Sequence, residues 1–88
     1  MENYISLSKV SDFFKSEFVT QWFNDCYEYL QLQYPDYEII SSDLDAIDVY
    51  RYDENEEDYH FVHSYEPGFK EGVLSLRESY SDEIILIH

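Results

Sequence analysis

Apolar residues recur every four positions over the first third of the chain, which is the spacing of one face of a helix. The stripe consists of Val10, Phe14, Phe18, Trp22, Cys26 and Leu30, widened by Val19, Phe23 and Tyr29. We therefore predict a helix over residues 8–34, which ends at Pro35 because the residue before a proline is pushed out of helical geometry. A break near Lys15 and Ser16 would divide this segment into two helices.

After Pro35 the apolar residues alternate with polar ones, which is the pattern of half-buried strands. Segments rich in β-branched and aromatic residues predict three short strands, over residues 37–40, 46–52 and 59–65. Residues 53–58 then join two of these strands as a hairpin connection. The C-terminal run Ile84–Ile87 is continuously apolar, which predicts a strand buried on both faces and therefore central in the sheet.

The segment before this last strand fits two structures. A short second helix over residues 68–80 is favoured by apolar residues at helical spacing, namely Phe69, Val73, Leu76 and Tyr80. Gly72 interrupts that pattern, and residues 73–79 also fit a strand paired with the C-terminal one. In both cases the predicted class is α+β, with one domain over residues 1–88. It comprises a long N-terminal helix packed on a small, mainly antiparallel sheet of about four or five strands.

Charge is the extreme feature of the composition, with twenty Asp and Glu against five Lys and Arg and a formal net charge of −15. Aromatic residues make up 19% of the chain, which indicates a folded core and not a disordered acidic segment. The negative charge repels nucleic acid and anionic lipid, so the sequence argues against direct nucleic-acid binding. It attracts basic proteins, including those whose own ligand is a polyanion.

Cysteine content and the N-terminal sequence bear on localisation. The lone cysteine, Cys26, cannot form an internal disulfide, which suits a reducing cytoplasm. The N-terminus has neither a basic region nor a long apolar run, and no stretch approaches the roughly 20 apolar residues that span a bilayer. We therefore expect a cytoplasmic protein without a membrane segment, as a monomer or a dimer.

Known catalytic and metal-binding patterns do not fit the chain. An EF-hand calcium loop starting at Asp53 fails because its sixth residue is Asp58 instead of glycine and its twelfth is Ser64 instead of glutamate. His60 and His63 are expected on opposite faces of a strand, which is wrong for shared metal coordination. The lone cysteine lies on the apolar helix stripe, in acidic surroundings that disfavour a thiolate. We therefore predict a protein that is not an enzyme and has no cofactor or metal.

The negative charge is concentrated in the middle of the chain. Residues 36–58 contain ten acids and one base, Arg51, for a local net charge of −9. Tyrosines lie among these acids, and aromatic residues are frequent anchors at protein interfaces. If Val49 faces the core, its neighbours Asp48 and Tyr50 point to the opposite face of the strand. We predict a partner-binding surface made of Asp43, Asp45, Asp48, Tyr50, Tyr52, Asp53, Glu54, Glu56, Glu57, Asp58 and Tyr59.

Carboxylates on a folded surface imitate the charges of a nucleic-acid backbone. Alternate residues of a strand lie roughly 6.7 Å apart, whereas duplex DNA carries about one charge per 1.7 Å of its axis. The sequence therefore predicts a small stoichiometric inhibitor that occupies the basic nucleic-acid-binding surface of a nuclease or another enzyme. Phage or plasmid anti-defence proteins and immunity proteins or antitoxins against nucleases belong to this class. The alternative is an acidic adaptor or regulator that binds a basic protein unrelated to nucleic acid.

Overall fold

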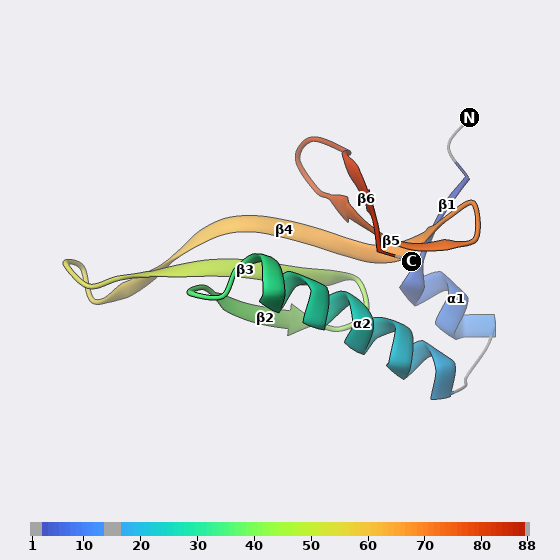
Figure 1. Ribbon diagram of the computed structural model, residues 1–88, viewed down its shortest axis with the longest axis horizontal. Coiled ribbons are helices and arrows are strands. Elements are labelled where there is room, and N and C mark those ends of the chain that lie inside the picture. The colour runs from blue at the N-terminus through green and yellow to red at the C-terminus, as the bar shows by residue number, and fades with distance from the viewer. Residues whose placement is uncertain (1–2, 14–16, 88) are drawn as a thin grey trace.

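An antiparallel sheet with helices on one side forms the architecture of the chain, which confirms the predicted α+β class (Figure 1). The computed structural model describes residues 3–13 and 17–87. In chain order, the elements within these residues are β1 (Tyr4–Ser6), α1 (Leu7–Phe13), α2 (Glu17–Gln33), β2 (Glu38–Ser42), β3 (Ala46–Asp53), β4 (Asp58–Lys70), β5 (Val73–Glu78) and β6 (Ile84–Leu86).

The long strand β4 organises the sheet, whose strand order is β2-β3-β4-β5-β6, with β1 also paired to β4. The first half of β4 pairs with β3, and this ladder reaches Tyr65. From Tyr65 to Lys70 the opposite edge of β4 pairs with β5. The short strand β1 pairs with Gly68–Lys70 and so continues the line of β3 along β4. Sequence patterns did not reveal β1, because three residues are too few to establish a period of two.

Helix α2 covers one face of the sheet, and the hydrophobic core lies between them (Figure 1). Strand β3 contributes Ile47 and Val49, which are fully buried. The Tyr27 hydroxyl of α2 donates a hydrogen bond to the Ile39 carbonyl at 2.9 Å, which ties the helix to β2. The rest of the buried cluster is Cys26, Leu30, Ile39, Tyr65, Leu74 and Leu76. Burial of these side chains on the α2 side leaves the other face of β2 and β3 for polar and aromatic residues.

The prediction of a single long helix over residues 8–34 is wrong. The main helix, α2, has 17 residues, and the seven-residue α1 precedes it. Both helices bury apolar residues, Leu7 in α1 and Val19 in α2 among them. A spacing of four residues identifies the buried side of each helix, but it does not show where one helix ends and the next begins. The predicted break at Lys15–Ser16 and the stripe residue Phe14 lie outside the described residues.

The segment over residues 68–80 is not a helix. It forms the end of β4, a two-residue turn and β5, and β5 pairs with β6 as the alternative prediction required. Glu71 and Gly72 have φ of 52° and 81°, the positive values that a tight hairpin turn of this length requires. Gly72 was therefore the residue that indicated a turn instead of a helix, since glycine adopts positive φ without strain.

The C-terminal strand is at an edge of the sheet, so its predicted central position is also wrong. Strand β6 pairs only with β5 among the described strands. Ile85 and Ile87 pack against the core, whereas Leu86 between them is 58% exposed. A run of four apolar residues fits a strand covered on both faces, yet here only one face is covered, and the run alone does not distinguish the two cases.

Cys26 is expected to be inert in the folded protein, since its side chain is fully buried in the core. Burial raises the pKa of the thiol from its ordinary 9.0 to about 12. At pH 8 the native chain should therefore react negligibly with a thiol reagent, whereas the chain unfolded in denaturant should react fully. Between pH 9 and 12 the unfolded chain ionises first, so the free energy of unfolding should fall. Rapid labelling of the native chain at pH 8 would contradict the buried position.

Candidate functional site

Strands β3 and β4 extend beyond the rest of the sheet as a two-stranded hairpin (Figure 1). The β2 ladder ends where Glu38 pairs with Tyr50, and the β5 ladder reaches β4 only as far as Tyr65. From Arg51 to His60 the two strands therefore pair only with each other among the described elements. We call residues 50–61 the arm. Its tip comprises residues 54–58, and the turn over residues 54–57 confirms the predicted hairpin connection.

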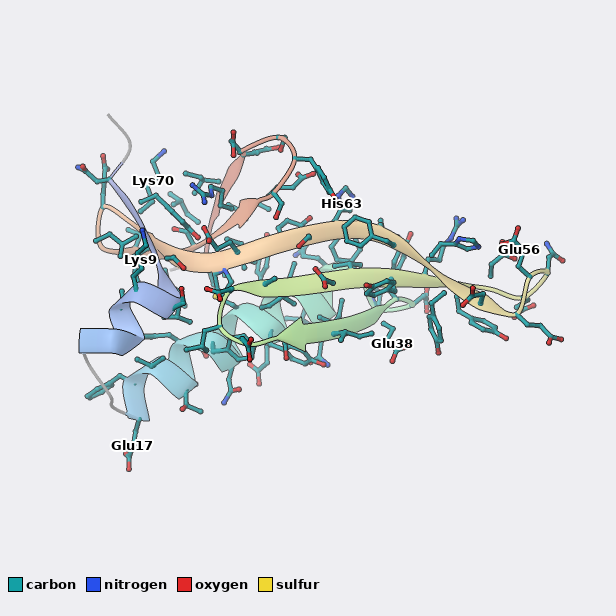
Figure 2. The ribbon with its side chains drawn as sticks, turned by 180° about the vertical axis from the view of Figure 1, so that it is seen from behind. Lys9, Glu17, Glu38, Glu56, His63 and Lys70 are labelled. Carbon is teal, nitrogen blue, oxygen red and sulfur yellow. The ribbon has the colours of Figure 1, made fainter. Side chains whose placement is uncertain are left out.

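Pairing register identifies the residues on the sheet face that α2 does not cover, because directly opposed residues point to the same face. Ile47 and Val49 are buried toward α2, so the alternate residues of β3 point away from the helix. Their partners on β2 and β4 share this face. We call it the open face, and it comprises Glu38, Ile40, Asp48, Tyr50, Tyr52, Tyr59, Phe61 and Ser64. Figure 2 shows the molecule from this side, with Glu38 beside the arm.

Aromatic rings gather on the open face. Tyr52 and Tyr59 are opposed across the arm with ring centroids 5.1 Å apart, and Tyr50 contacts Phe61 at 5.9 Å. Tyr80, from the turn after β5, extends the group by contacting Phe61 at 6.0 Å. We call these five residues the aromatic cluster. Four of its members are 43–77% exposed, which is unusual for large rings that already contact one another.

Carboxylates lie directly beside the aromatic cluster. The Tyr59 hydroxyl lies beside the Glu38 carboxylate, whose proximity raises the pKa of Tyr59 above its ordinary value. Asp48 accepts a hydrogen bond of 2.7 Å from the Ser64 hydroxyl. The residues that make up the open face include no Lys or Arg. The result is an exposed aromatic patch with acidic neighbours, of the kind that suits a cationic surface.

The predicted surface residues do not all lie together. Asp48, Tyr50 and Tyr52 share the open face, as the strand alternation predicted, and Tyr59 lies there opposite Tyr52. The predicted acids of the tip, Glu54, Glu56, Glu57 and Asp58, are exposed at the end of the arm. Asp53 and Asp58 are paired across the arm and share the other face, that of Arg51.

Asp43 and Asp45 lie apart from the others, in the turn between β2 and β3. Eight residues of strand separate Asp45 from Asp53, which corresponds to roughly 26 Å. Asp45 instead lines a polar hollow near β1, whose other lining residues are Tyr4, Ser6, Ser8, Lys9, Glu66 and Arg77. The predicted set therefore does not form one continuous surface.

Sequence reasoning missed five members of the site, Glu38, Ile40, Phe61, Ser64 and Tyr80. The first four follow from period-two alternation once the strand register is known. Tyr80 joins the cluster only through the position of the turn after β5, since it was assigned to a helix. Strand register and loop position depend on tertiary packing, so neither was readable from the pattern alone.

The two histidines were predicted on opposite faces, and this prediction is wrong. A β-bulge at Val62 shifts the register, so that His63 opposes Val49 and His60 opposes Arg51. Both histidines therefore share the α2 side, but they have different partners. His63 Nδ1 lies 3.3 Å from a carboxylate oxygen of Glu78.

His60 lies among the acids at the base of the tip. Its Nε2 is 2.8 Å from Glu56 Oε2 and 3.5 Å from Asp53 Oδ2. The ligand atoms of these three residues are all within 4.8 Å of one another, a mixed nitrogen and oxygen set that first-row transition metals accept. Asp53 Oδ1 also accepts the backbone N–H of Asn55 at 2.8 Å, which closes the turn. The cluster is exposed and its contacts are those of an ion pair, so we assign no metal to it.

The described basic residues lie mostly at the end of the molecule opposite the arm. In Figure 2, Lys9 and Lys70 are near one end of the long axis and Glu56 is at the other. Arg77 belongs to the same basic end, where it bonds Glu66 at 2.7 Å. Arg51 is the exception, but it points to the face opposite the aromatic cluster. The molecule is therefore electrically polarised, with its negative charge toward the arm.

Comparisons of this chain with protein-family models, with curated proteins and with solved structures found no match. Among the described residues, no helix combines the length and apolar character needed to cross a membrane.

Proposed function

We propose that this protein is a stoichiometric inhibitor that covers the basic, nucleic-acid-binding surface of an enzyme with its open face and arm. The observation that carries the proposal is the aromatic cluster beside Glu38 and Asp48, in a part of the sheet face that has no described Lys or Arg. Exposed rings supply contact area, and the carboxylates supply electrostatic complementarity to a cationic groove. A nuclease or another nucleic-acid-binding enzyme presents such a groove.

The shape of the arm supports insertion into a groove. Its two strands project from the body of a molecule that measures 45 × 29 × 19 Å, and the exposed tip carries Glu54, Glu56, Glu57 and Asp58. A two-stranded ribbon fits a groove that accepts a nucleic-acid strand or duplex, as β-ribbons fit the major groove in the reverse case. Charge at the leading end of the arm favours rapid encounter with a basic partner.

The absence of a recognisable catalytic apparatus in the sequence agrees with a binding function, since binding alone needs no nucleophile or acid–base pair. Phage or plasmid anti-defence proteins and immunity proteins or antitoxins against nucleases are the biological settings that need such an inhibitor. In each setting a small acidic protein blocks a nucleic-acid enzyme by occupying its substrate site.

A titration experiment tests the proposal. The chain is immobilised, partners are captured from an extract of the source cells at low salt, and each captured enzyme is assayed on its nucleic-acid substrate. We expect the free chain to inhibit one captured enzyme with a one-to-one end point, and labelled duplex or single strand to compete with the chain for it. Capture of a basic protein that lacks a nucleic-acid site, or binding unaffected by nucleic acid, would contradict the inhibitor and favour the acidic adaptor.

A further inference from the structure

The sheet already contains one filled site for a cation next to an aromatic ring. The Arg77 guanidinium lies over the ring of Tyr4, 4.6 Å from its centroid, and bonds the Glu66 carboxylate at 2.7 Å. Glu66 is two residues from Ser64 on β4, so Glu66 and its cross-strand partner Arg77 point to the same side of the sheet as the open face but lie outside it, toward the basic end. A tyrosine ring, a carboxylate from the neighbouring strand and a guanidinium thus form one complete set at the basic end.

The arm holds the same set without its cation. Tyr52 and Tyr59 present rings that are 47% and 49% exposed, and the Tyr59 hydroxyl lies beside the Glu38 carboxylate. Glu38 lies on β2, the strand beside β3. In the same way, Glu66 lies on β4, the strand beside the one that carries Arg77. No base of the described chain lies on this face of the arm, because Arg51 opposes His60 on the other face.

We infer that the partner supplies the missing guanidinium, so that the arm recognises an arginine side chain of the partner across Tyr52 and Tyr59, with Glu38 as its carboxylate acceptor. The inference rests on the proposed function and deepens it by naming the chemical group that the open face selects. It predicts that the partner's contact surface carries arginine, whereas recognition by net charge alone would accept lysine equally well.

The chemistry of the two cations explains the selection. A guanidinium is planar and weakly hydrated, so it stacks on an aromatic ring while its edge donates two hydrogen bonds to one carboxylate. An ammonium is compact and strongly hydrated, and it gains less from the same ring. Steering by the acidic tip acts on both cations equally, so the difference between them reports on the aromatic set alone.

Two fluorescently labelled nonapeptides, one of arginine and one of lysine, are the probes for this inference. We expect the full chain to bind the arginine peptide about tenfold more tightly by fluorescence anisotropy. The double variant Tyr52→Leu with Tyr59→Leu should bind both peptides with the affinity that the lysine peptide has for the unmodified chain. The matched control Phe18→Leu, an exposed ring on α2, should keep the tenfold preference.

A second variant distinguishes loss of the aromatic rings from loss of structure in the arm. Replacing both tyrosines by phenylalanine keeps the rings, so the preference for arginine should persist. Equal binding of the two peptides by the unmodified chain would overturn the inference and leave the inhibitor proposal standing. If neither peptide binds at low salt, both the inference and the proposed function are contradicted.

Discussion

Exchange of the four tip carboxylates for amides is expected to slow association with the basic partner by about 10- to 100-fold. The variant combines Glu54→Gln, Glu56→Gln, Glu57→Gln and Asp58→Asn. These side chains are exposed at the end of the arm, where they meet an approaching partner first. Because the tip steers the encounter and the aromatic cluster holds the complex, dissociation should change much less. Stopped-flow measurement of both rate constants checks this.

The design of the tip variant keeps the turn intact. Asp53 is left unchanged because its Oδ1 accepts the backbone N–H groups of Asn55 and Glu56 at 2.8 and 3.4 Å. Asp58 Oδ1 accepts the N–H of Tyr59 at 2.8 Å, and the asparagine oxygen can accept the same bond.

A control variant with the same change in net charge separates local from global electrostatics. It carries Glu→Gln at four exposed positions outside the arm, namely Glu17, Glu28, Glu71 and Glu83. This control should slow association only a few-fold, and added salt should reduce the difference between the two variants. Equal slowing by both variants would show that net charge, and not the arm, steers the encounter.

Ile47→Ala is expected to lower the free energy of unfolding by about 2–5 kcal/mol, which is a large part of the stability of a domain of this size. Ile47 is fully buried on the α2 side of β3, so its truncation leaves a cavity in the core. Chemical denaturation followed by tyrosine and tryptophan fluorescence measures the change, with an unaltered dependence on denaturant concentration as the sign of a pure stability effect.

Ile40→Ala is the matched control, because it removes the same atoms from the open face. Ile40 is 44% exposed and opposes Asp48, so its truncation should change the free energy of unfolding by only about 0.5 kcal/mol. Comparable destabilisation by the two substitutions would show that the open face is covered by another part of the protein. That result would remove the basis for a binding surface there.

Local signals in the sequence predicted the elements whose ends are set by backbone chemistry. Pro35 follows closely on the end of α2 at Gln33, and the six polar residues from Asp53 to Asp58 became the hairpin tip. The alternation around Val49 placed Tyr50 and Tyr52 on one face. In each case the deciding information lies within a few residues along the chain.

Features that depend on long-range packing could not be read in the same way. The run Ile84–Ile87 carries no information on how many strands flank it, and β6 is at the edge. The bulge at Val62 moved His63 to the face of His60, and nothing in the local pattern marks this extra residue. Phe61 and Tyr80 meet only because the turn after β5 lies beside β4. The acidic character of the site was therefore predictable. Of its aromatic cluster, only Tyr50, Tyr52 and Tyr59 were predicted.

The role of the open face in binding can be measured by NMR on the isotopically labelled chain with and without the basic partner. We expect the signals of Tyr50, Tyr52, Tyr59 and Phe61 to shift or broaden on binding, together with those of the tip, while those of α2 keep their positions. Perturbation confined to α2, with the open face unchanged, would show that the partner binds elsewhere.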